Sequence, residues 1–241
     1  MIGTERQREI LEYIKTYETI SVQQIVKKFY VSEATARRDL NVLEKSGLIR
    51  RVFGGATLVV GSDRQVPLFV REREDEREKS NIGARAATLV RDGQILFIDG
   101  SSTAQFLLPY LSKFKDLIII TNGLKIAQEL GDMHIKVYST GGLLMENSSV
   151  LTGADAERFV DAFNADICFL SCKGLSEDGK LTDTSYSETE LRKHFLANAH
   201  TRVMLITKNK LGKKYIHTLC NAKDVDYIVM DEDTPLVRVG E

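Results

Sequence analysis

Val-Ser-Glu-Ala-Thr-Ala-Arg-Arg-Asp-Leu, residues 31–40, combines a helix start with two adjacent arginines. Ser32 can cap a helix, because its hydroxyl accepts a hydrogen bond from a free backbone N–H of the first turn. Thr35, Arg37 and Arg38 follow early in that helix, where a recognition helix contacts base edges. Arginine binds guanine O6 and N7 or a phosphate, and threonine binds a phosphate or the thymine methyl group. The stretch therefore predicts a DNA recognition helix.

A competing interpretation is a solvated helix in which Arg37 and Arg38 pair with the acidic residues at positions 33, 39 and 44. For an isolated segment this explanation is preferable, because such pairs are common on helix surfaces. The preceding sequence decides against it. Apolar residues recur at helical spacing in residues 6–14 and again in residues 22–29, where Ser21 stands as a cap. Together with the third helix they predict a helix-turn-helix.

Two β-prone runs follow the third helix and are separated by Gly54-Gly55. Glycines between such runs predict a hairpin with positive φ at its turn, the wing of a winged helix. Arg50 and Arg51 stand on the first strand of this wing, where they would contact the sugar-phosphate backbone. Arginines on the helix and the wing would converge on one surface, which disfavours a helix-turn-helix used only for protein contact.

These residues resemble the DeoR family of bacterial transcription regulators. The match runs position by position through Arg6, Ile10 and Ile14 and, after seventeen residues, through Ser32 and the run 35–40, Thr-Ala-Arg-Arg-Asp-Leu. Phe53 replaces the histidine that the family usually has in its His-Gly-Gly-Ala wing. This departure leaves the hairpin intact and affects only a minor phosphate contact.

The charge of the chain is divided unevenly between its two ends. Residues 1–60 carry ten Lys and Arg against seven Asp and Glu, and the remainder carries 23 against 27. A basic amino-terminal part agrees with binding to phosphate. Length and composition predict three segments: a winged helix-turn-helix domain at 1–60, a linker at 61–80 with a helical, charged second half, and a sensor domain at 81–241. Pro67, Arg71 and Lys79 also fill positions that the family tends to fill.

Cysteine and histidine usage predicts neither a disulfide framework nor a metal site. The three cysteines are too few and too irregularly spaced for a framework, and we expect them to be buried thiols in a reducing compartment. The four histidines lack ligand spacing, so no metal and no cofactor is expected. No signal peptide or long apolar run appears, which predicts a cytoplasmic protein with no membrane partner.

Helices and strands are predicted to alternate after residue 80. We expect helices at 82–89, 103–114, 124–130, 154–163 and 188–199, and strands at 94–98, 117–120, 135–139, 167–171, 203–206 and 225–230. Such alternation predicts a mostly parallel sheet covered on both faces. The fold class is therefore α/β, with an amino-terminal winged helix-turn-helix domain.

Ligands of parallel α/β domains bind beyond the carboxyl ends of the strands. The loops predicted there are small and polar, and each alone is explained by ordinary turn chemistry. Four in succession favour a pocket for a small phosphorylated, hydroxylated ligand, with Asp99 holding sugar hydroxyls, loop N–H and hydroxyl groups holding the anion, and Lys173 adding positive charge. The expected ligand-binding residues of these loops are Asp99, Gly100, Ser101, Ser102, Thr103, Thr121, Asn122, Gly141, Gly142 and Lys173.

The same loops carry the DeoR resemblance through the second domain. The family pattern appears as the run 99–103, Thr121-Asn122, Gly141-Gly142, Gly153, Gly174-Leu175 and Leu181-Thr182-Asp183, and Lys210-Leu211-Gly212 resembles the Ser-Lys-Phe-Gly segment of the family. The resemblance implies a sensor domain related in fold to ribose-5-phosphate isomerase, with Lys210 among its ligand-binding residues. Gly100-Ser101-Ser102 departs from the usual order, and Thr207 stands where an aspartate is usual, which bears on the sugar that is recognised.

The favoured function is a sequence-specific DNA-binding regulator, a repressor of sugar-metabolism genes gated by a phosphorylated sugar. Two-fold operators are bound by dimers, so we expect a homodimer or higher homo-oligomer. The alternative is a phosphosugar isomerase with an accessory nucleic-acid domain, in which Asp99, Asp155 and Lys173 would do the proton chemistry. Against this alternative, the Lys-Gly-Gly-Gly-like segment of the isomerases is interrupted at residues 173–176, Lys-Gly-Leu-Ser. We therefore expect no enzymatic activity.

Overall fold

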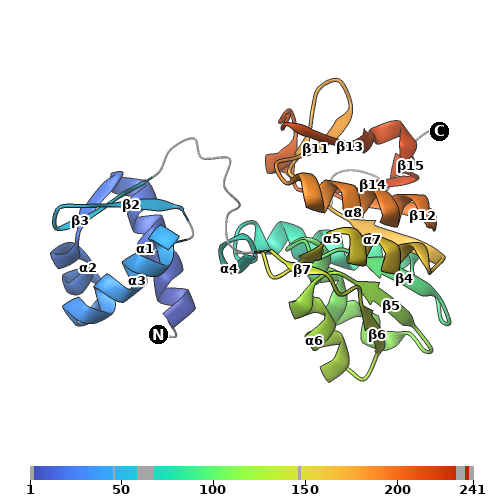
Figure 1. Cartoon of the computed structure of the whole chain (residues 1–241), viewed down its shortest axis with the longest axis horizontal. Coiled ribbons are helices and arrows are strands. Elements are labelled where there is room, and N and C mark those ends of the chain that lie inside the picture. Colours follow the sequence, from blue (N-terminus) through green and yellow to red (C-terminus); the bar gives the residue numbers. More distant parts are fainter. Residues whose placement is uncertain (1–2, 46, 59–67, 146–147, 232–236, 239–241) are drawn as a thin grey trace. The chain divides into compact units, whose positions relative to one another are not determined.

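The computed structural model describes residues 3–45, 47–58, 68–145, 148–231 and 237–238. It divides into two compact units, Met1–Arg71 and Glu72–Glu241. In Figure 1 the first unit is mostly blue, and the second runs from blue-green through green and yellow to red. Pro67 and the expected domain boundary at residue 60 lie outside the described residues.

The first unit is a three-helix bundle with a small antiparallel sheet. Its core is built from the apolar stripes that the sequence predicts, with Ile10, Ile25 and Leu40 fully buried. The sheet has the order β1-β3-β2, in which the predicted hairpin β2–β3 gains a third strand at Ile20. The elements are α1 (Gly3–Tyr17), β1 (Thr19–Ser21), α2 (Val22–Phe29), α3 (Glu33–Lys45), β2 (Ile49–Val52), β3 (Gly55–Leu58) and α4 (Leu68–Arg71).

The second unit is organised by a seven-stranded sheet of order β15-β14-β12-β9-β4-β5-β6. All its strand pairs are parallel except β14–β15, which confirms the predicted mostly parallel sheet. The strands of the sheet are β4 (Ile95–Ile98), β5 (Ile118–Thr121), β6 (Lys136–Ser139), β9 (Ala165–Leu170), β12 (Ala199–Leu205), β14 (Tyr227–Val229) and β15 (Val237–Arg238).

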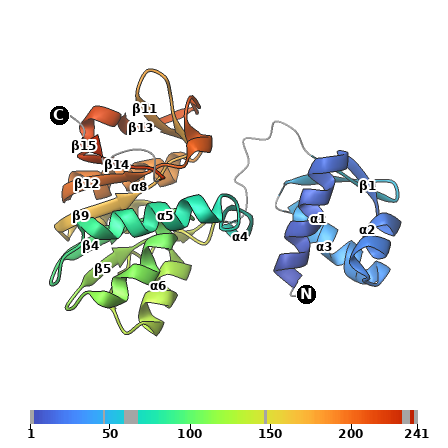
Figure 2. The same ribbon diagram turned by 180° about the vertical axis from the view of Figure 1, so that it is seen from behind.

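Helices cover both faces of this sheet, because its central strands β4, β5 and β9 carry apolar residues on both sides. On β4, Leu96 and Ile98 pack with one group of helices and Phe97 with the other. Figures 1 and 2 show these two layers from opposite sides. The first layer holds α5 (Glu76–Ala86), the 3₁₀ helices η1 (Ala87–Leu89) and η2 (Ala104–Lys113), and α6 (Leu124–Asp132); the second holds α7 (Ala154–Asp161) and α8 (Tyr186–Ala197).

Short strands that the sequence did not predict complete the unit. A two-stranded ladder pairs β7 (Leu143–Leu144) with β8 (Leu151–Thr152). A separate antiparallel sheet joins β10 (Gly174–Leu175), β11 (Lys180–Asp183) and β13 (His217–Asn221), and the 3₁₀ turns η3 (Lys208–Lys210) and η4 (Ala222–Asp224) flank β13 in the chain. The predicted helices at 124–130, 154–163 and 188–199 are found with ends shifted by a few residues. The helix predicted at 82–89 begins earlier, at Glu76 within the expected linker, and its last three residues form a 3₁₀ turn, while 103–114 is wound as a 3₁₀ helix.

Helix α5 lies against η2 at a position that only glycine can occupy. A Cβ at Gly83 would stand 2.1 Å from the carbonyl oxygen of Phe106. The two helices therefore approach to backbone contact. Since η2 follows the loop at residues 99–103, this contact holds α5 next to the carboxyl edge of the sheet.

Candidate functional site

The predicted recognition helix is α3, and it starts as the sequence indicates. The hydroxyl of Ser32 accepts a hydrogen bond from the N–H of Thr35 at 3.1 Å and also contacts the Thr35 hydroxyl at 2.9 Å. Arg37 pairs with Glu33, with Nη2 2.5 Å from Oε1, which is the intrahelical pair of the competing interpretation. Arg38 is exposed, and in the described part of the chain no hydrogen bond or ion pair holds it. Of the two adjacent arginines, Arg38 is therefore the one that can bind an external ligand without breaking an internal contact.

Helix α3 is held against α1 by a buried ion pair. Asp39 is 1% exposed and accepts hydrogen bonds from Arg6 Nε at 2.6 Å and Gln7 Nε2 at 3.0 Å. The hydrogen bond to Asp39 also raises the pKa of the Arg6 guanidinium. Asp39 is therefore not a partner of Arg37 or Arg38. This contact explains why Arg6 and Asp39 belong to one sequence pattern although 33 positions separate them.

The wing hairpin forms as predicted, but its two glycines have different structural roles. Gly54 has φ +75° and lies in the turn, whereas Gly55 is the first residue of β3, where a Cβ would stand 2.1 Å from the Ile20 carbonyl oxygen. Arg50 is exposed on β2. Arg51 instead braces the wing, because its guanidinium donates to Asn41 Oδ1 on α3 at 2.7 Å and to the Gly55 carbonyl at 3.2 Å.

The expected ligand loops of the second unit gather at one edge of the large sheet. They follow β4, β5, β6 and β9, and η3 with Lys210 follows β12, so the five loops leave the carboxyl ends of neighbouring parallel strands. Two of the loops touch through their backbones. A Cβ at Gly100 would lie 3.0 Å from the Cα of Gly123 and 2.2 Å from Val150 Cγ1, so glycine is needed there for close packing.

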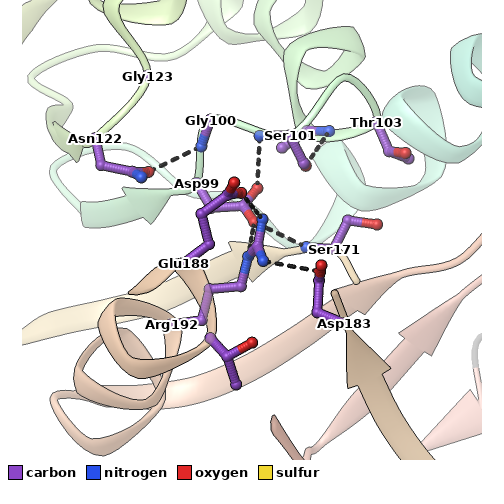
Figure 3. A network of polar contacts seen from close by, with 12 residues as sticks. Asp99, Gly100, Ser101, Thr103, Asn122, Gly123, Ser171, Asp183, Glu188 and Arg192 are labelled. Carbon is purple, nitrogen blue, oxygen red and sulfur yellow. Dashed lines mark hydrogen bonds and ion pairs between the residues drawn. The ribbon is translucent and has the colours of Figure 1, made fainter. Parts of the chain in front are cut away.

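A buried cluster of four charged side chains lies beneath these loops (Figure 3). Arg192 on α8 donates through Nε to Asp99 Oδ2 at 2.7 Å. Its two terminal nitrogens donate to Asp183 and Glu188, each at 3.0 Å. Burial by itself disfavours the charged guanidinium, but the three surrounding carboxylates outweigh burial and raise the pKa of Arg192.

The contacts of Asp99 correct one expectation. Its carboxylate is 1% exposed and accepts hydrogen bonds from the N–H groups of Ser101 and Ser171 in addition to the Arg192 bond. Both oxygens are engaged by the protein, so Asp99 is not open to sugar hydroxyls. It holds two of the loops in place instead.

Thr121 and Asn122 are likewise engaged inside the protein. Asn122 accepts a hydrogen bond from the Gly100 N–H and donates to the Leu151 carbonyl, at 2.9 and 3.0 Å. The Thr121 hydroxyl is fully buried and accepts from the Gly123 N–H at 3.0 Å. These residues shape the loops, and the structure leaves them little capacity for a ligand.

Two partly exposed lysines and five hydroxyl residues, four of them buried, form a polar layer next to the cluster. Lys210 Nζ donates to Ser171 Oγ at 2.7 Å and approaches Thr103 Oγ1 at 3.3 Å. Lys173 Nζ donates to Thr184 Oγ1 at 2.6 Å. The Ser101 hydroxyl accepts from the Ala104 N–H at 3.2 Å. Within the described residues the Ser102 hydroxyl makes no hydrogen bond, although the residue is only 6% exposed. Gly141 and Gly142 are exposed and remain accessible to a ligand.

Arg192 and Glu188 were absent from the residues expected at the site, and Asp183 had no assigned role. A signal existed in the sequence, because Arg192 falls on the buried face of α8 between Leu191 and Phe195. A basic residue among apolar ones on a helix face predicts a buried partner.

The described residues contain no group of three or more His, Cys, Asp and Glu arranged to hold a metal ion. Among the same residues no helix is long and apolar enough to cross a membrane.

The whole chain matches known proteins. Residues 6–60 match a family model described as a DeoR-like helix-turn-helix domain, and residues 74–232 match one described as a DeoR C-terminal sensor domain. The chain is 34% identical to the HTH-type transcriptional regulator GolR of Listeria innocua, over 96% of this chain and 91% of that protein. It is 28% identical to the glycerol-3-phosphate regulon repressor of Escherichia coli, over 98% and 94% of the two chains.

Among solved structures, ribose 5-phosphate isomerase A from Methanocaldococcus jannaschii matches 57% of this chain and 55% of its own, with 19% identity and a TM-score of 0.43. The two family models together span most of the chain, and the relatives align over nearly all of it. This protein therefore belongs to the DeoR family of transcription regulators.

Proposed function

We propose that this DeoR-family regulator is a cytoplasmic homodimeric repressor whose affinity for operator DNA falls when a phosphorylated sugar binds its second unit. The observation that carries the effector half is Lys210, a cation placed among the hydroxyls of Ser171 and Thr103 at the carboxyl edge of the sheet. The relative that is named a glycerol-3-phosphate regulon repressor supports a phosphorylated, hydroxylated effector.

The DNA half rests on Arg38 and Arg50. Both are exposed, and both lack a partner among the described residues, so neither must give up an internal contact to bind DNA. Arg51 supports the wing, whose first strand carries Arg50, through Asn41. Arg37 can contribute after exchanging Glu33 for a phosphate, because exposed ion pairs are weak.

The phosphate of the effector is assigned to Lys210 and the loop at residues 101–103. Lysine and hydroxyl groups suit an anion, and the buried Asp99 and its neighbours are shielded from it by the loop backbone and by Arg192. In this arrangement the phosphate binds the lysine, because the carboxylates that would repel it are buried beneath the loops. The sugar hydroxyls then face Ser102, Gly141 and Lys173.

We further propose that the protein is not an isomerase. Proton abstraction needs a carboxylate open to the substrate, and Asp99 is enclosed by three donors. Asp155, the other carboxylate considered for this role, is exposed on α7 and pairs with Arg158. Homodimer formation is proposed because two-fold operators require two recognition helices.

Fluorescence anisotropy on DNA upstream of the gene of this protein tests the DNA half at stated salt. Arg38→Ala should weaken cognate binding by about 1–3 kcal/mol if the residue contacts a base, and it should relax specificity at that position. Loss of a phosphate contact alone would weaken all DNA equally and lower the salt slope. Unchanged affinity in Arg38→Ala and Arg50→Ala would refute the assigned interface.

The effector half is tested by adding ribose 5-phosphate, glycerol 3-phosphate and inorganic phosphate to the same DNA complex. Lys210→Ala should lower the affinity for the active compound by roughly 10–150-fold, the equivalent of about 1.5–3 kcal/mol for one charged hydrogen bond. Lys208→Ala is the matched control, since this exposed lysine stands on the same turn. Consumption of a sugar phosphate without any DNA binding would favour the isomerase instead.

A further inference from the structure

The turn that carries Lys210 is hydrogen-bonded to the start of α5, more than 120 positions away in the chain. The backbone N–H of Lys208 donates to Glu78 Oε1 at 2.5 Å. The side-chain amide of Asn209 donates to Asp75 Oδ2 at 2.6 Å. Glu78 lies in the first turn of α5 and Asp75 is its N-cap. Two adjacent residues of η3 are therefore hydrogen-bonded to the N-terminal end of α5.

The backbone of Lys210 belongs to the same turn as these two donors. The three residues of η3 form a single turn, closed by the hydrogen bond from the Lys210 N–H to the Thr207 carbonyl at 3.0 Å. The buried Thr207 hydroxyl adds a 2.7 Å hydrogen bond to Asn209 Oδ1, which fixes the amide that faces Asp75. Thr207 stands where the family usually has aspartate, and in this chain it orients the linking amide.

The start of α5 in turn depends on η3 for its polar partners. Asp75 is the N-cap of α5, but its side chain makes no cap hydrogen bond and its φ is +54°. A capping aspartate ordinarily accepts from the helix it precedes. Here the backbone is left-handed and the carboxylate is turned to Asn209 instead, so the Asn209 amide takes the place of the helix N–H groups as its partner.

A second contact ties the same segment to another ligand loop. Lys125 on α6 pairs with Glu72 at 2.7 Å, and α6 begins directly after the loop that contains Thr121 and Asn122. Residues 72–78 are therefore bonded to the elements that follow β5 and β12. They are also the first residues of the second unit, immediately after Arg71, the last residue of the DNA-binding unit.

We propose that the η3–α5 contact, made of Lys208, Asn209, Asp75 and Glu78, is the element that couples effector binding to DNA affinity. An anion that draws Lys210 away from Ser171 and Thr103 shifts η3 as one body. The shift breaks or redirects the hydrogen bonds to Glu78 and Asp75, at the start of the helix that follows Arg71 in the chain. Such a device has two discrete hydrogen-bonding states, which a coupling element requires. The inference rests on the proposed function and names its regulatory route.

The test uses the full chain and the double variant Glu78→Ala/Asn209→Ala. Glu78→Gln is the rescue variant, because its amide oxygen still accepts from the Lys208 N–H. Glu76→Ala is the matched control, since it removes the same charge from the same first turn but bonds Arg73 rather than η3. DNA affinity is measured by anisotropy without and with inorganic phosphate and ribose 5-phosphate, and binding of each probe is measured by calorimetry.

The wild type should lose DNA affinity by a factor in the range of about 5–150 when the active probe is added, the usual size of such coupling. In the double variant this factor should fall below about 2, with probe binding retained, and Glu78→Gln and Glu76→Ala should respond as the wild type does. Hydrogen exchange of residues 72–80 should change on probe addition in the wild type and stay constant in the double variant.

Two outcomes contradict the inference and can be told apart. If the double variant responds to the probe as strongly as the wild type, the η3–α5 contact is not the coupling element and the proposed function stands. If the wild type binds DNA but neither probe alters its affinity, the effector part of the proposed function fails and the coupling fails with it.

Discussion

Replacing Arg192 with methionine should be the most damaging single change in the sensor unit. The guanidinium contacts Asp99, Asp183 and Glu188 at 2.7, 3.0 and 3.0 Å, and all four side chains are at most 8% exposed. Methionine fills part of the volume but leaves three buried carboxylates without a cation. Removal of one partner of a buried ion pair costs about 3–5 kcal/mol, a large fraction of the stability of an ordinary domain.

Urea unfolding followed by circular dichroism measures this loss. At roughly 2 kcal/mol per molar urea, a loss of about 4 kcal/mol lowers the midpoint by about 2 M. Arg192→Lys keeps the charge but not the three-way donor geometry, so it should lose about half as much. Arg158→Met is the control, because Arg158 pairs with Asp155 at the surface and its loss should stay within about 0.5 kcal/mol. A midpoint for Arg192→Met within about 0.25 M of the wild type would refute the reasoning.

Three further outcomes are expected. Asp39→Ala should destabilise the first unit by about 1.5–3 kcal/mol in thermal unfolding, because Arg6 loses its charged partner. The same change should weaken DNA binding. If both properties were unchanged, the Arg6–Asp39 pair would not be what holds α3 against α1. Gly83→Ala should cost about 1–3 kcal/mol, since the new Cβ meets the Phe106 carbonyl oxygen, whereas Gly131→Ala in α6, with nothing within 4 Å, should be neutral or stabilising. Native protein at pH 8 should protect Cys168 and Cys172 from a thiol reagent and expose them only in urea, because both are buried and burial raises their thiol pKa to about 12 and about 11. Since these thiols stay protonated in the fold at a pH where exposed thiols ionise, the fold should lose stability as the pH rises from about 9 toward 12; rapid labelling of both thiols in the native protein at pH 8 would contradict their burial.

The elements with strong local signals were predicted well from the sequence. The apolar stripes of α1 and α2, the cap at Ser32 and the glycine turn of the wing each depend on neighbours within one or two turns of chain. The parallel strands were predictable for a related reason, since a run such as Ile95–Ile98, buried on both faces, must be apolar throughout.

Contacts between distant segments could not be predicted in the same way. Strand β1 has only three residues and becomes a strand by pairing with β3, 34 to 38 positions later, so it leaves no periodic pattern. Asp39 stands beside two arginines in the sequence, yet its partner is Arg6 on another helix. Asp99 has the chemistry of a sugar ligand, and only the position of Arg192 shows that its oxygens are already engaged. The sequence predicted that polar loops gather at one edge of the sheet. Only the fold shows which of their residues stabilise the loops and which can contact a ligand.

The order of the strands at the proposed effector site also determines when in synthesis the site can form. Its loops follow β4, β5, β6, β9 and β12, so the site is complete only after residue 210 has been synthesised and five strands have paired in parallel, a slow kind of folding. The first unit needs only residues up to Arg71. At roughly 5–20 residues per second, a ribosome takes on the order of 10 s to pass from one point to the other. Each new molecule therefore has a DNA-binding unit that can fold before the unit that controls it.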